Sequence, residues 1–241
     1  MNAIWIISKR ELQSFFDSLI AYIMLVAFLG FSGFFTWLYG QDIFLIGQTS
    51  LRGFFSIAYW TLFFFIPALT MRLLAEEKKT GTIELLLTKA VSDREVVLGK
   101  FLATLLLICI ALVFTIPYVI TLSNIGNLDL GATICGYLGL VMMSITYIGI
   151  GIYASSITNN QIVAFLLALF IGLFFHIIFD VLAPNFTGWL GEIFVFMSLS
   201  THFESISRGV LDTKDIIYFL SLGAVGILLA ELSLAKRNLN S

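Results

Sequence analysis

The sequence contains few charged residues: Asp, Glu, Lys and Arg together make up 12% of its 241 residues. A soluble domain carries roughly a quarter. None of these four residue types occurs from residue 130 to residue 179, an interval of 50 residues. That interval is long enough for two membrane crossings of about 20 residues each. The shortage of charge excludes an ordinary soluble domain, and the 59% of hydrophobic residues indicates a protein of the bilayer.

Motifs for nucleotide, metal and catalytic chemistry are also missing. The sequence has no GxxxxGK[ST] phosphate loop, since Gly99-Lys100 is followed by Phe101, and it has no HExxH motif or Cys/His ligand spacing. We therefore expect a non-enzymatic chain that holds no metal, ATP or other cofactor itself. The 13 basic residues are too few and too confined to one membrane face for binding to nucleic acid.

Cysteine and proline are rare, with two and three residues respectively. Cys109 and Cys135 fall at different depths of their predicted spans, so we expect no disulfide between them. Pro67 and Pro117 lie inside predicted spans and predict helix kinks there.

Long apolar runs predict an all-α membrane protein with six transmembrane helices. If the N-terminus is cytoplasmic, ten basic residues face the inside and only Arg52, Arg208 and Lys214 face the outside, as the positive-inside rule requires. We therefore expect an integral protein of the bacterial inner membrane with both termini in the cytoplasm. The predicted spans are residues 19–39, 54–74, 101–122, 132–155, 161–183 and 216–235.

The segments outside the spans complete a single predicted permease domain, residues 1–241. Residues 1–18 have the pattern of an interfacial helix with apolar Trp5 and Phe15 on one face. Residues 184–215 form an outer loop whose apolar part, residues 185–200, is too short to cross and indicates short re-entrant helices. The shared apolar face of the first helix comprises Trp5, Leu12, Phe15, Phe16 and Leu19.

Glycine and alanine recur in two of the spans. Small residues at intervals of three or four let helices approach closely. They are consistent with a packed bundle or with an interface to a second copy, and their spacing does not separate the two. They are Gly136, Gly139, Gly149 and Gly151 in the fourth span, and Ala164, Ala168 and Gly172 in the fifth.

The most informative segment is a charged loop, residues 75–100, between the second and third spans. It holds five of the 13 basic residues and a short apolar run, Ile83–Leu87, that could dock into a groove on a soluble partner. Ser92 and Glu95 form a capping box that starts the next helix before it enters the bilayer. An amphipathic helix lying on lipid without a partner is the plainer alternative.

One enzymatic alternative rests on Ser32 and His176. Gly30-Phe31-Ser32-Gly33 matches the GxSG of rhomboid-type intramembrane serine proteases, and both residues fall at similar depths in different spans. A Ser–His dyad would make the chain an intramembrane serine protease. Against this, GxSG is also ordinary small-residue packing, and no further donors for an oxyanion hole stand out.

The loop carries a family resemblance. Residues 76–87, EEKKTGTIELLL, followed by Val96, Gly99 and Lys100, resemble the cytoplasmic loop of ABC-2 type transporter permeases. Residues 202–210 and 215–220 are most similar to the gliding-motility-associated GldF-type permease subunit within that family. The resemblance implies the ABC-2, or type V exporter-like, fold: six spans, an interfacial helix, a coupling helix and short outer helices.

The resemblance also implies partners. A cytoplasmic ABC ATPase subunit would carry ATP and Mg, a second permease subunit would complete a homo- or heterodimer, and lipid would surround both. In the coupling helix, apolar Ile83, Leu86 and Leu87 suit a groove on the ATPase, and Lys78, Lys79 and Glu84 suit its rim. A non-transporting scaffold with the same fold is a further alternative. The expected ATPase-docking residues are Glu76, Lys78, Lys79, Gly81, Thr82, Ile83, Glu84, Leu86 and Leu87.

Overall fold

A computed structural model describes residues 3–38, 50–82 and 91–237, and every regular element in these ranges is helical. Besides the helices named below, a π-helical turn spans Phe174–Ile178 and a 3₁₀ turn spans Ala183–Asn185. The α-helices are α1 Ala3–Asp17, α2 Ile20–Trp37, α4 Arg52–Thr70, α5 Ala75–Thr80, α7 Asp93–Val113, α8 Ile116–Ile125, α9 Leu130–Ser156, α10 Gln161–Leu173, α11 Phe179–Leu182, α12 Trp189–Met197, α13 Leu199–Ser207 and α14 Thr213–Arg237.

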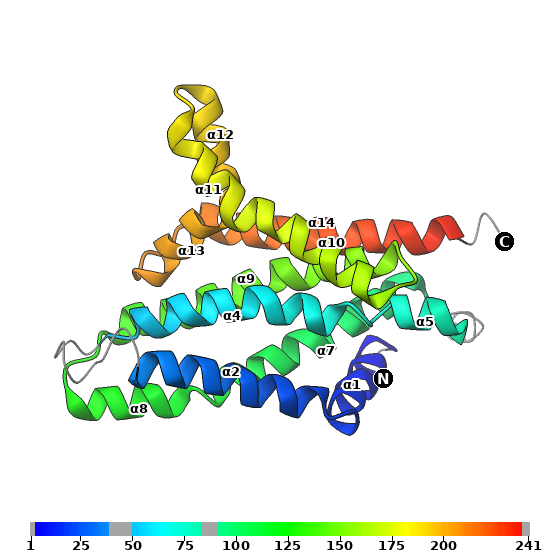
Figure 1. Ribbon diagram of the computed structural model, residues 1–241, viewed down its shortest axis with the longest axis horizontal. Helices are drawn as coiled ribbons and strands as arrows, with labels where there is room; N and C mark the ends of the chain where they lie inside the picture. Colours follow the sequence, from blue (N-terminus) through cyan, green and yellow to red (C-terminus); the bar gives the residue numbers. More distant parts are fainter. Residues whose placement is uncertain (1–2, 39–49, 83–90, 238–241) are drawn as a thin grey trace.

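Six of the described helical stretches are long and apolar enough to cross a membrane, which confirms the predicted all-α membrane fold. They run roughly along the long axis of the molecule (Figure 1). Both chain ends lie at the same end of this bundle as α5, which we call the α5 end (Figure 1). The six stretches are Ile20–Trp37, Arg52–Thr80, Asp93–Ile125, Leu130–Ser156, Gln161–Asn185 and Thr213–Lys236.

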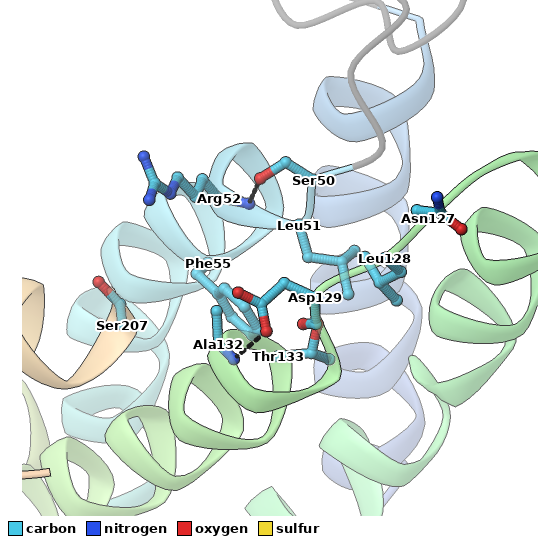
Figure 2. Close-up of a pocket in the computed structure, with 10 residues that line it drawn as sticks. All are labelled: Ser50, Leu51, Arg52, Phe55, Asn127, Leu128, Asp129, Ala132, Thr133 and Ser207. Atoms are coloured by element: carbon cyan, nitrogen blue, oxygen red, sulfur yellow. Dashed lines mark hydrogen bonds between the residues drawn. The ribbon is translucent and has the colours of Figure 1, made fainter. Parts of the chain in front are cut away.

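Helix α9 is the most buried of the six and packs against α4, α7, α10, α13 and α14. Its carboxylate cap, Asp129, accepts a hydrogen bond from the Ala132 N–H at 3.0 Å (Figure 2). Its glycines face neighbouring helices of the same chain: a Cβ on Gly149 would lie 2.6 Å from the carbonyl oxygen of Gly223 on α14. Ala164 and Ala168 of α10 are buried as well. The small residues therefore pack this bundle internally, which decides between the two alternatives left open by their spacing.

Two of the membrane-length stretches depart from regular α-helix, one near a proline and one near a histidine. The third breaks between α7 and α8, where Pro117 stands in the first turn of α8 and Thr115 Oγ1 donates to the Leu112 carbonyl at 2.6 Å. Pro67 is instead accommodated inside α4, which continues to Thr70. The fifth span passes from α10 through the π-helical turn that contains His176.

Helix α1 packs against α7 with part of the predicted apolar face turned inward. Trp5 is 50% exposed, whereas Ile7, Ser8 and Phe15 are buried. The reason is the close approach of α7: a Cβ on Gly99 would lie 2.7 Å from the Ile7 Cβ. The packed face of α1 therefore includes Ile7 as well as Phe15, and Trp5 lies outside it.

Helices α11 and α12 project sideways from the bundle, and α13 returns to lie against α9 (Figure 1). A buried pair fixes α13 to the start of α14: His202 Nδ1 lies 2.7 Å from Asp215 Oδ1. The His202 ring stacks on Tyr218 with centroids 4.0 Å apart. His202 Nε2 lies 2.9 Å from the Phe196 carbonyl oxygen, so the ring has an acceptor at each nitrogen.

The crossing of α9 and α14 generates the first prediction. A Cβ on Gly226 would lie 2.6 Å from the Gly149 carbonyl oxygen, whereas one on Gly30 of α2 would meet nothing within 4 Å. We expect Gly226→Val to cost about 1–3 kcal/mol, because overpacking a close crossing forces the backbones apart. Thermal unfolding of the detergent-solubilised chain measures the effect. Gly30→Val is the matched control, and equal melting temperatures for the two variants would contradict the crossing.

Candidate functional site

The site predicted from sequence is only partly described. Gly81 ends α5 with φ of 70°, the left-handed conformation that glycine adopts without strain. Glu76, Lys79, Gly81 and Thr82 are exposed at the α5 end, where a soluble partner could reach them. Ile83, Glu84, Leu86 and Leu87 lie outside the described residues. Docking through this set therefore stays a prediction.

The side chain of Lys100 joins three helices, α1, α5 and α7. Its ammonium, on α7, is 1% exposed and lies 2.7 Å from Glu77 Oε1 on α5. It also lies 3.1 Å from Glu11 Oε1 on α1. A buried ammonium requires paired carboxylates because desolvation would otherwise be too costly. This Lys100 triad (Lys100, Glu11 and Glu77) therefore ties α1, α5 and α7 to one another.

The charge of Lys100 also controls the ionisation of Glu11. Burial alone raises the pKa of the Glu11 carboxyl, but the charge of Lys100 and hydrogen bonds from Arg10 and Lys100 outweigh it. The net result is a pKa below the ordinary value, so Glu11 remains ionised at neutral pH. The triad thus places a carboxylate, and not a neutral acid, beside the buried ammonium.

Helix α5 is joined to α9 by a serine hydroxyl. Ser155 Oγ accepts hydrogen bonds from the Leu74 and Ala75 N–H groups, both at 3.0 Å. The same hydroxyl donates to the Met71 carbonyl at 2.9 Å. Ser155 therefore holds the turn between α4 and α5 against the end of the central helix.

A second link runs from α5 through the last residue of α9 to α14. Lys78 donates to the Ser156 carbonyl oxygen. Ser233 of α14 donates to the same oxygen at 3.0 Å. Lys78, expected at the rim of an ATPase groove, is half-buried and contacts the protein's own α9. With the Lys100 triad, these bonds connect α5 to α1, α7, α9 and α14.

The helix cap at the start of α7 has the geometry of a capping box. Ser92 Oγ accepts from the Glu95 N–H at 3.3 Å, and Glu95 Oε2 accepts from the Ser92 N–H at 2.9 Å. These bonds satisfy two backbone donors that a helix start otherwise leaves open. The helix that carries Lys100 is therefore ordered from Asp93 onward.

A polar cleft of about 470 Å³ lies between α1 and α5. Its walls include Arg10, Arg72, Glu76, Thr82 and Lys100. Arg72 is fixed there, because its guanidinium donates to Ser18 Oγ at 3.2 Å and lies 5.2 Å from the centroid of the Phe15 ring. The cleft adjoins the predicted docking segment and presents both signs of charge to it.

The structure gives Ser32 and His176 separate partners. Ser32 Oγ donates to the Leu29 carbonyl of its own helix at 3.4 Å. His176 Nδ1 lies 2.6 Å from the hydroxyl of Tyr147, and its ring stacks on Tyr59 and Phe63. No Ser32–His176 hydrogen bond occurs among the described residues, and the protease alternative is not favoured.

Sequence reasoning identified Lys100 only as part of a family motif and missed Glu11 and Glu77 as its partners. A signal was present: Lys100 lies seven residues beyond Asp93 and directly precedes a long apolar run. A cation carried into an apolar bundle needs carboxylates nearby. The sequence offers several acids, however, and does not say which of them fold back to it.

The Lys100 triad generates a stability prediction. Lys100→Met leaves Glu11 and Glu77 close together with only Arg10 as a cation beside Glu11, and breaking such a buried pair costs about 3–5 kcal/mol. We expect the melting temperature in detergent to fall far more than for Lys79→Met, an exposed cation on the same end. The combined variant Lys100→Met/Glu11→Gln/Glu77→Gln should recover part of the loss, since it removes the unpaired charges. Equal effects of Lys100→Met and Lys79→Met would contradict the triad.

Comparison with known proteins now adds the family. No curated relative matches the chain. Residues 5–190 match the family described as ABC-2 family transporter protein. This stretch includes α1 from Trp5 onward, α5, and five of the six membrane-length helices. The six apolar helices make it an integral membrane protein. The chain belongs to the ABC-2 family of transporter permeases.

Proposed function

We propose that this chain is the permease subunit of an ATP-driven exporter, powered by a separate cytoplasmic ABC ATPase that docks on the segment between α5 and α7. The observation that supports this most is the bonding of α5. The short helix is joined by side chains to α1, α7 and α9, and through the Ser156 carbonyl of α9 to α14. A helix so held can transmit a displacement to the whole bundle.

The transmission would follow from rigidity. The Lys100 triad resists separation of α1, α5 and α7, because pulling the ammonium from its carboxylates exposes a buried charge. Ser155 holds α5 to α9, whose length spans the bundle. ATP binding and hydrolysis in the docked subunit would therefore tilt these helices together. The ATP and Mg would belong to that partner.

The proposed orientation places the α5 end in the cytoplasm of a bacterium, with the chain in the inner membrane. Arg52, Arg208 and Lys214 lie at or near helix ends remote from α5, where Arg52 begins α4 and Lys214 is in the first turn of α14. The other described cations cluster at the α5 end, as the positive-inside bias requires. They are Lys9, Arg10, Arg72, Lys78, Lys79, Arg94, Lys100 and Lys236.

A second permease subunit, identical or related, would complete the exporter. Helices α2, α10 and α14 are the least buried of the six membrane-length helices, so they offer the surfaces for this subunit and for lipid. A role in gliding motility is the finer proposal. It is supported by the similarity of residues 202–210 and 215–220 to GldF-type permeases.

The docking proposal is tested by adding charge to the apolar run. We expect Ile83→Asp and Leu86→Asp to abolish co-purification of the ATPase subunit and stimulation of its activity, because a buried carboxylate is strongly disfavoured in an apolar groove. Ser123→Asp, an exposed acid added on α8, is the control and should leave both intact. If the two loop variants still bind and stimulate the ATPase normally, the docking site is wrong.

Transmission is tested separately from docking at Ser155. Ser155→Ala removes the acceptor of the Leu74 and Ala75 N–H groups but leaves the docking segment unchanged. We expect the ATPase subunit to bind with unchanged affinity while its stimulation falls severalfold, since α5 would no longer move with α9. Ser155→Thr, which keeps the hydroxyl, should restore most of the stimulation. Loss of binding and stimulation in parallel would speak against a transmitting role.

A further inference from the structure

A cavity of about 410 Å³ lies between α4, the π-helical turn and α13, towards the end of the bundle remote from α5. Its floor is aromatic and buried, formed by Phe55, Tyr59, His176 and Phe203. The Tyr59 ring stacks on His176 with centroids 4.1 Å apart, and on Phe203 with centroids 4.6 Å apart. Apolar parts of a ligand would find a matching surface here.

Two polar atoms of this floor are unsatisfied. Tyr59 Oη and His176 Nε2 are buried and have no hydrogen-bond partner among the described residues. Tyr59 is 6% exposed and His176 is 2% exposed, so bulk water does not reach them freely. His176 Nδ1 already faces the Tyr147 hydroxyl, and in either tautomer Nε2 still needs a partner. Buried polar groups without partners are rare and costly, so both atoms indicate a bound polar group.

The rim of the cavity carries both signs of charge. Arg52, Asp180, Glu204 and Arg208 are exposed there, and Asp180 accepts a hydrogen bond from Ser198 at 3.4 Å. Tyr59 follows Arg52 by seven residues on the same helix, which places it about 10 Å deeper. A ligand that fits therefore needs a head with one positive and one negative group, and an oxygen below the head that can form hydrogen bonds.

The adjacent pocket does not share this chemistry. It also measures about 410 Å³ and shares Arg52 and Phe55 with the first cavity (Figure 2). Its carboxylate, Asp129, is engaged as the cap of α9, and the Arg52 guanidinium points away from it (Figure 2). Neither orphaned atom of the first cavity lines it.

We propose that the cavity between α4, the π-helical turn and α13 binds one zwitterionic phospholipid of the membrane. The head occupies the rim, with its phosphate at Arg52 and Arg208 and its amine at Asp180 and Glu204. An ester carbonyl below the head accepts a hydrogen bond from Tyr59 Oη, and the His176 N–H tautomer donates to the same group. The acyl chain lies over the Phe55 and Phe203 rings. This site goes beyond the proposed ATPase docking and does not depend on it.

The carbonyl contact can be tested by competition between two lipids. The full chain is placed in mixed micelles with equal amounts of diester phosphatidylethanolamine and its diether analogue, which lacks the carbonyls. Native mass spectrometry then gives the ratio of the two lipids that remain bound. We expect a preference of about fivefold for the diester in the wild type, the worth of one net hydrogen bond.

Matched variants separate the contact from folding. Tyr59→Phe removes one of the two donors to the carbonyl and should lower the ratio towards one, whereas Tyr22→Phe removes an exposed hydroxyl of α2 and should leave it unchanged. Arg52→Gln should lower the amount of both lipids without changing their ratio, because it weakens only the head contact. A ratio of one in the wild type, or an unchanged preference in Tyr59→Phe, would overturn the proposal. So would retention of a peptide or a second copy in place of lipid.

Discussion

The arrangement of the α5 end depends on one buried ammonium. Lys100 is carried by α7 into an apolar bundle, and it is stable there only because Glu11 and Glu77 meet it from two other helices. Here the two carboxylates come from different helices, α1 and α5. The requirement that all three helices converge is therefore a constraint on the fold as a whole. It is consistent with α1 lying against α7 with Ile7 and Phe15 inward and Trp5 exposed.

Helix α9 extends this constraint along the bundle. At the α5 end its Ser155 and Ser156 receive α5 and α14. Midway, Tyr147 contacts the His176 ring across the π-helical turn. Near the other end Gly139 leaves room for Phe203 of α13, with a virtual Cβ 3.3 Å from that ring. One helix thus touches the proposed docking region, the centre of the bundle and the wall of the cavity.

The sequence predicted the parts of this structure that depend on local composition. The six apolar runs are much longer than the helices of a soluble core. In a bilayer such runs form helices, because a helix pairs its backbone hydrogen-bonding groups within itself. The Ser92–Glu95 cap and the break near Pro117 depend on neighbours within a few residues, so they too could be recognised. Gly and Ala spacing predicted close packing but not its partner, because spacing defines a face and not what covers it.

The parts that could not be predicted are long-range pairings. Lys100 and Glu11 are 89 residues apart, and the His202–Asp215 pair closes a turn between two helices whose angle no local signal gives. The contact of α1 with α7 could not be predicted, because an amphipathic pattern is similar for lipid and for protein contact. Tyr59 and His176 appeared as an aromatic and a lone histidine in separate spans. Only the packed structure shows that Tyr59 Oη and His176 Nε2 line one cavity and have no hydrogen-bond partners among the described residues.

The two ends of the bundle differ in the kind of contact that joins their helices, and this bears on mechanism. At the α5 end the ionic contacts of the Lys100 triad join α1, α5 and α7, so a force applied there would move these helices together. At the cavity, Tyr59 on α4 and His176 on the π-helical turn are bridged by ring stacking alone. A ligand can be coupled to motion only if its contacts differ between the two positions of these helices. The two orphaned atoms lie on separate elements, and α4 leads directly to α5. A tilt of α4 would therefore change their separation, and with it the affinity for any group that bridges them.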